Sequence, residues 1–251
     1  MPTDIRLLAL LHLCDSLFPT GSFAHSDGLE TATSAGLVST AADLREWMDV
    51  CLEENLGRFE AHAVWLALTA RMQDDWRKLQ ELDAEVTALR PSSTARAASR
   101  AMGTRLLKTW REIRAEAADT PDAPELLVRR SSIANTVSEG GKLGTTYCDG
   151  PFSLPVAFGI VCATIGVEPR AAVEAFVYTR LASIASSAMR LMPIGQREAH
   201  AVLAAALARV PAVVDAVALR CERGHSLGAF APALDLAAMG QQHVRSRLFL
   251  S

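Results

Sequence analysis

Apolar residues recur along this chain at the spacing of an α-helix, and this periodicity limits the fold more than any other feature. The clearest example is the stripe Leu44, Trp47, Met48, Cys51, Leu52, Leu56 and Phe59. Residues three and four apart lie on one face of a helix, so each stripe is a face that a core can bury. No segment alternates apolar and polar residues as a half-buried strand would. The spacing predicts an all-α protein.

The helical patterns predict a single-domain bundle of about nine or ten helices over residues 1–222. A short helix is expected over 25–34, and Thr40 with Asp43 fits the start signal of the next one. Further helices are expected over 61–72, 74–90, 94–117, 124–137, 153–166, 169–191, 196–209 and 211–222. No long polar linker separates two units, so we expect one domain. Residues 223–251 lose the periodicity, which predicts an extended C-terminal tail.

Charge and cysteine content exclude several classes of protein. With 25 basic and 28 acidic residues the net charge is −3, whereas a nucleic-acid-binding face is dense in Lys and Arg. The apolar stretch 154–167 runs for only about 14 residues, whereas a membrane-spanning helix needs roughly 20. The five cysteines are odd in number and form no C-x-x-C pair. We therefore expect a cytoplasmic protein that binds neither nucleic acid nor membrane.

The residues that could carry chemistry do not form a recognisable active site. His25, Ser26 and Asp27 are adjacent, so they point to different faces of a helix and cannot form a catalytic relay. The run 140–142 (GGK) lacks the first glycine and the Ser or Thr of a phosphate-binding P-loop. Cys221 and His225 are two soft ligands, too few for a closed metal site. We expect no catalytic residue, cofactor or resident metal, although a weak or shared metal site and a hydrolase built on His25 or Cys221 stay open as alternatives.

Five short motifs are more informative about the protein family than the composition is. In chain order they are 16–30 (SLFPTGSFAHSDGLE), 98–107 (ASRAMGTRLL), 155–159 (PVAFG), 190–196 (RLMPIGQ) and 246–251 (SRLFLS). Together they resemble the signature segments of the UreF family of urease accessory proteins, in the same order and over nearly the whole chain. The chain departs from the family pattern at Leu17, where proline is frequent, at Ser153-Leu154, and at Gln241, where histidine is frequent.

The resemblance implies an all-helical, non-catalytic protein of urease maturation. Proteins of this family bridge UreD (also called UreH) and the GTPase UreG, in a complex that delivers nickel to apo-urease. The resemblance also implies a homodimer within that assembly. The alternative is a stand-alone metallochaperone that binds nickel itself.

The resemblance also selects residues for partner binding or for the local geometry of the motifs. They are Pro19, Gly21, Phe23, His25, Ser26, Gly28, Leu29, Glu30, Arg190, Pro193, Gly195, Gln196, Arg247, Leu248, Phe249 and Ser251. Pro19 and Gly21 suit a sharp turn, because proline fixes φ and glycine permits φ > 0. Gly28 would let another backbone approach closely.

The charged and C-terminal members of this set carry the more specific hypotheses. Glu30 is expected to cap a helix or to face an arginine of a partner, and Arg190 to pair with a carboxylate. Pro193 is expected to end the long helix before it. Burying Leu248, Phe249 and Leu250 would contribute roughly 1.5–3 kcal/mol each, against an ordering cost of about 1–2 kcal/mol per residue. We therefore expect a tail that is mobile in the isolated protein and docks on UreD.

Overall fold

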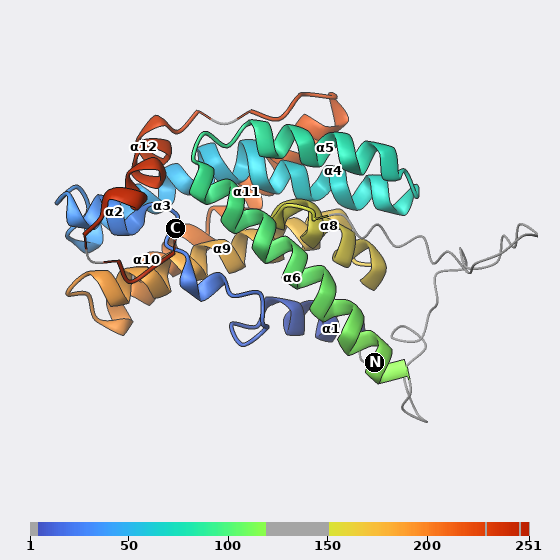
Figure 1. Cartoon of the computed structure of the whole chain (residues 1–251), viewed down its shortest axis with the longest axis horizontal. Coiled ribbons are helices and arrows are strands. Elements are labelled where there is room, and N and C mark those ends of the chain that lie inside the picture. Colours follow the sequence, from blue (N-terminus) through green and yellow to red (C-terminus); the bar gives the residue numbers. More distant parts are fainter. Residues whose placement is uncertain (1–4, 119–150, 229, 246, 251) are drawn as a thin grey trace, which may run out of the picture.

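The computed structural model describes residues 5–118, 151–228, 230–245 and 247–250, and every regular element in these ranges is a helix. The all-α prediction is confirmed for this part of the chain. The helix expected over 124–137 and the GGK run at 140–142 lie outside the described residues. Figure 1 shows the helices in chain order.

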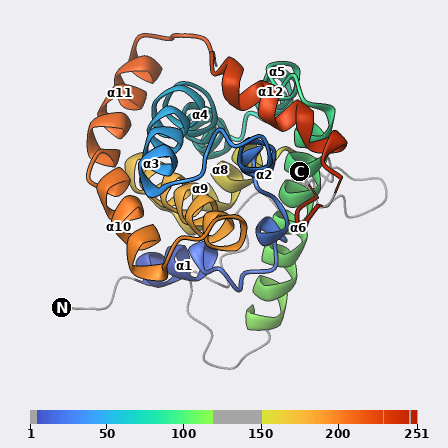
Figure 2. The same ribbon diagram turned by 90° about the vertical axis from the view of Figure 1, so that its left-hand side faces the viewer.

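The centre of the bundle is α8 (Leu154–Ile165), which is apolar on all sides and buried almost throughout. It packs against α4 (Ala61–Met72), α6 (Ser93–Ala118) and α9 (Pro169–Leu191). Seen end-on in Figure 2, α3, α4, α8 and α9 lie inside, and α1, α5, α6, α10, α11 and α12 lie around them. A Cβ atom on Gly159 would lie 2.6 Å from the Val64 carbonyl oxygen, so this glycine lets α4 and α8 approach each other closely.

The surrounding elements complete the bundle. They are α1 (Ile5–Cys14), the 3₁₀ turn η1 (Ser22–Ala24), α2 (Leu29–Ser34), α3 (Ala41–Val50), the π-helical η2 (Cys51–Glu60), α5 (Trp76–Ala88), α10 (Gln196–Leu207), α11 (Val210–Glu222), α12 (Pro232–Gly240) and the 3₁₀ turn η4 (Gln241–His243). The helical backbone continues from α3 through η2 into α4 without a break. The apolar stripe that begins at Leu44 therefore lies on one continuous helix.

Two helix ends follow directly from local sequence. At the start of α3 the Asp43 amide donates to Thr40 Oγ1 at 3.2 Å, and the Thr40 amide donates to Asp43 Oδ2 at 2.9 Å. This reciprocal pair is the predicted capping box. At the end of α9, Met192 is extended, as a residue before proline tends to be, so Pro193 ends the helix as predicted.

The short N-terminal helix begins later than predicted. It was expected from residue 25, but α2 starts at Leu29. Asp27 and Gly28 both have positive φ, at 51° and 86°, and this conformation cannot be part of a right-handed helix. The signature residues before Leu29 therefore form a turn rather than a helix.

The tail also differs from its prediction. The described residues of 223–231 and 244–250 form turns, bends and irregular chain, but α12 and η4 lie between them. Moreover, α12 packs against α2 and α6, and the side chain of Phe249 is only 3% exposed. The expectation that the tail does not settle on its own domain is wrong for these residues, because it finds polar and apolar partners in the N-terminal signature.

The sequence-based prediction compared only the run 154–167 with the length of a membrane-spanning helix, but the apolar stretch 196–222 is longer. By length and composition alone it could cross a membrane. In the structure it forms two helices, and Arg209 between them pairs with Asp49 and Glu53. Their inner faces are buried in the bundle core through Val202, Leu203, Val214 and Val217.

Candidate functional site

The N-terminal signature folds into a turn that lies against the C-terminal part of the chain. Gly21 has φ of 77°, as the sharp turn predicted there requires, and its backbone lies against the Arg105 guanidinium. Gly28 is approached closely by the backbone of another segment. A Cβ atom at this position would lie 2.8 Å from the Ala238 amide nitrogen of α12. The predicted close approach at Gly28 is confirmed, and α12 is the segment that makes it.

Glu30 binds the last described residues of the chain. Its carboxylate accepts hydrogen bonds from the amides of Leu248 at 2.5 Å and Phe249 at 3.3 Å, and from Nε2 of Gln241. The next amide, of Leu250, donates to the Ala24 carbonyl at 2.7 Å. Glu30 is buried, so the prediction that it faces an arginine of a partner is wrong. It binds this chain's own backbone instead.

Arg190 and Thr31 complete the contact, which we call the C-terminal junction (Glu30, Thr31, Arg190, Gln241 and Phe249). The Arg190 guanidinium lies over the Phe249 ring, 4.3 Å from its centroid, which is a cation–π contact. Thr31 donates to Oε1 of Gln241 at 3.0 Å. The junction therefore joins three of the five motifs, which are up to about two hundred residues apart in sequence.

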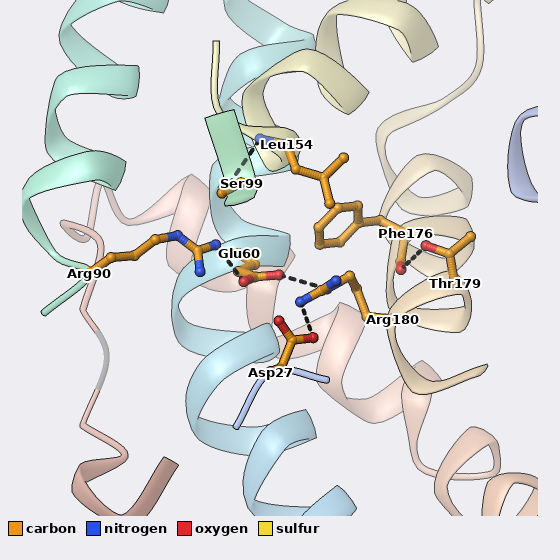
Figure 3. A network of polar contacts seen from close by, with 8 residues as sticks. All are labelled: Asp27, Glu60, Arg90, Ser99, Leu154, Phe176, Thr179 and Arg180. Atoms are coloured by element: carbon orange, nitrogen blue, oxygen red, sulfur yellow. Dashed lines mark hydrogen bonds and ion pairs between the residues drawn. The ribbon is translucent and has the colours of Figure 1, made fainter. Parts of the chain in front are cut away.

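A network of buried charges lies beneath the N-terminal turn (Figure 3). Arg180 of α9 donates from Nη2 to Asp27 Oδ2 at 2.5 Å, and its Nε forms an ion pair with Glu60 Oε2 at 3.2 Å. The other Glu60 oxygen accepts from Arg90 Nη2 at 2.5 Å. The Glu60 side chain is 1% exposed and that of Arg180 is 8% exposed. We call Asp27, Glu60, Arg90 and Arg180 the charge network.

Pairing keeps Asp27 and Arg180 ionised despite their burial. Burial works against the charge of Arg180, but Asp27 and Glu60 hold its pKa above the ordinary value. Burial would likewise raise the pKa of Asp27, yet the neighbouring Arg180 leaves that pKa below the ordinary value. The network thus fixes the N-terminal turn to η2 and α9 by charge-assisted bonds.

Sequence reasoning did not find the charge network, although a local signal exists. Arg180 falls in the apolar stripe of α9, four residues after Phe176 and next to Leu181. Glu60 likewise follows Phe59 at the end of a stripe. A charged residue on a face that a helix buries needs a partner of opposite charge. The identity of that partner requires the tertiary structure.

The other predicted residues divide into buried and exposed groups. Those buried with the N-terminal turn are His25, Ser26 and Leu29, and those exposed are Pro19, Pro193, Gln196 and Arg247. Gly195 precedes α10 as its N-cap. Ser251 and the side chain of Phe23 lie outside what the structure describes.

Two cavities adjoin these elements. A cavity of about 60 Å³ lies beside the charge network and is also lined by Asp235, which suits a few water molecules. A groove of about 490 Å³ lies between the segment 11–22 and α9. Arg180 lines both, so its side chain lies between the cavity and the groove.

The alternatives based on catalysis or metal binding gain no support from this geometry. Burial raises the pKa of the Cys221 thiol to about 12, so it is not an activated nucleophile. Burial also lowers the pKa of His25, which Asp27 opposes and Arg180 reinforces. Within the described ranges, no three His, Cys, Asp or Glu side chains are grouped so that they could hold a metal ion.

Comparison with known proteins gives a consistent result over the whole length. A family model described as UreF matches residues 38–207. The urease accessory protein UreF of Arthrobacter sp. (strain FB24) is 30% identical over 97% of this chain and 96% of its own length. That of Kocuria rhizophila is 30% identical over 100% and 99%, and that of Azoarcus sp. (strain BH72) is 30% identical over 98% and 96%. The match to the Kocuria protein thus extends over both terminal motifs, which lie beyond the family model.

Proposed function

Since the chain belongs to the UreF family of urease accessory proteins, we propose that it acts in urease maturation as a non-catalytic scaffold. In this proposal it bridges UreD (UreH) and the GTPase UreG, and the resulting complex delivers nickel to cytoplasmic apo-urease. The chain would act there as a homodimer. An accessory role and association with other urease accessory proteins follow from the family, whereas the individual partners are the proposal.

The observation that carries the proposal is apolar surface around the C-terminal junction. Phe249 points inward, but Leu248 and Leu250 on either side are 59% and 67% exposed. Leu236 and Met239 of the adjoining α12 are exposed as well. Leu248 and Leu250 lie two residues apart on one segment, and neighbouring exposed apolar side chains are typical of a protein–protein interface. The junction thus holds the segment 247–250 in place while its outer side chains stay available to UreD.

This changes how the tail would dock. The segment need not become ordered at the moment of binding, because Glu30 already fixes its backbone. A preorganised segment loses less conformational entropy on association. The stand-alone metallochaperone lacks a comparable observation, since no metal-binding group of three side chains lies in the described part of the chain.

The test is co-purification with UreD of a double variant, Leu248→Ser/Leu250→Ser. Both side chains are exposed, so the free energy of unfolding should change by less than about 0.5 kcal/mol per site. Capture of UreD should fall at least tenfold, which corresponds to about 1.4 kcal/mol of binding free energy. Met72→Ser, at a position 69% exposed on the end of α4, is the matched control and should bind normally. Normal capture by the double variant would show that the segment 247–250 is not the docking element.

A further inference from the structure

His62, near the start of α4, is a buried histidine without a well-formed hydrogen bond. Its side chain is fully buried, and neither Nδ1 nor Nε2 has a partner of good geometry. Nε of Arg220, on the neighbouring α11, is also buried without a partner. A buried polar atom without a hydrogen bond costs about 1–3 kcal/mol. The contact between α4 and α11 therefore contains buried nitrogen atoms without hydrogen bonds, which lower the stability of this contact.

The segment 223–231, which connects α11 to α12, is attached at this same contact. The helix α11 ends in a Schellman motif, in which the His225 amide donates to the Arg220 carbonyl at 3.0 Å and Gly224 adopts φ of 64°. Nη2 of Arg220 then donates to the Ser226 carbonyl at 3.3 Å. The Gly228 amide reaches the Arg58 carbonyl at 3.4 Å, one helical turn before His62. These long bonds and the buried Leu227 attach the segment to the bundle.

Burial and positive charge both disfavour a proton on His62. Burial is the larger cause, Arg220 of α11 and His225 of the connecting segment add to it, and the Arg58 carbonyl of η2 opposes it weakly, so the pKa of His62 falls to about 4. The adjacent Cys221 of α11 remains a neutral thiol. The helices α5, α8 and α9 also pack against α4, but in the described ranges none of their charged groups affects this ring.

We propose that the contact between His62, Arg220 and residues 223–228 is a proton-sensitive hinge, whose opening releases these residues from η2 and α4. Opening admits water to the imidazole, which then accepts a proton that it cannot hold in the closed state. Acidification therefore shifts the equilibrium towards the open form. The proposal concerns the isolated chain and does not depend on the partners in urease maturation.

Amide hydrogen exchange of the full chain, corrected for intrinsic rates, tests the hinge at pH 7.5 and 5.0. With a pKa of about 4 closed and an ordinary value of 6.5 open, the opening constant of residues 223–228 should rise about 30-fold. It should exceed the opening constant of α8 at both pH values, because the segment opens by itself. His62→Leu should abolish the rise, and His200→Gln, at an exposed histidine of α10, should preserve it.

Three results would overturn the hinge. They are an opening constant that does not change with pH, an undiminished rise in His62→Leu, and equal protection of the segment and α8, which would mean that they open only together. If His62→Leu does not fold, the imidazole resonances of the wild-type chain decide the question. A His62 that titrates near 6.5 in the folded protein would contradict the proposal.

Discussion

Glu60 and His62 are two residues apart, both are buried, and the fold treats them in opposite ways. Glu60 forms ion pairs with two arginines in the charge network, Arg90 and Arg180. His62 has no such partner, and its pKa falls to about 4, so the ring is neutral at neutral pH. A buried ionisable group is tolerated either when it is paired or when it gives up its charge. The first solution depends on the partner residues and the second on the pH.

Removing the central cation should have the largest effect. Arg180→Met leaves Asp27 and one Glu60 oxygen without their guanidinium, and the unfolding free energy should fall by about 3–5 kcal/mol. Arg209 also pairs with two carboxylates, but its side chain is 40% exposed, so Arg209→Met should cost less than about 1 kcal/mol. Urea unfolding of both variants measures the difference. Equal losses of unfolding free energy in the two variants would mean that burial does not make the Arg180 ion pairs more important for stability than those of Arg209.

Lowering the pH tests the contribution of the neutral His62 to stability. The folded pKa of His62 lies below its ordinary value, so between pH 6.5 and about 4 the unfolded chain binds the extra proton. Stability from this group is complete above pH 6.5 and declines as the pH falls towards 4, by about 3 kcal/mol in total. Over this range the wild type should lose about 3 kcal/mol of unfolding free energy relative to His62→Leu, as pH-dependent urea unfolding of both proteins measures. Parallel pH profiles of the two proteins would assign the acid sensitivity to other groups.

A smaller effect is expected from Gly28, which lies next to Asp27 of the charge network. Gly28→Ala combines a left-handed conformation with a Cβ atom 2.8 Å from the Ala238 amide, and should cost about 2–3 kcal/mol. Gly224 has a similar φ but open space around it, so Gly224→Ala should cost only about 1 kcal/mol. Thermal unfolding compares the pair. A cost at Gly28 no greater than at Gly224 would show that α12 moves away easily.

The sequence-based predictions succeeded where the determining interactions are local. The capping box at Thr40, the end of α9 at Pro193 and helices such as 61–72 and 169–191 depend on residues within a few positions of one another. Burial of the tail depends instead on Glu30, more than two hundred residues away, and no periodicity reports such a contact. The charge network was missed for the same reason, although Arg180 within an apolar stripe signalled that a partner exists.

The carboxylate of Glu30 also has a consequence for the order of events during synthesis. Its backbone partners are 218 and 219 residues further along the chain. At bacterial and eukaryotic translation rates of about 5–20 residues per second, this separation amounts to about 10–40 s. Throughout that interval the Glu30 carboxylate of α2 lacks its final hydrogen-bond partners, because the amides of Leu248 and Phe249 have not yet been synthesised. Interrupted translation products would therefore keep a solvated Glu30 and an uncovered α2, a difference that quality-control proteases could recognise.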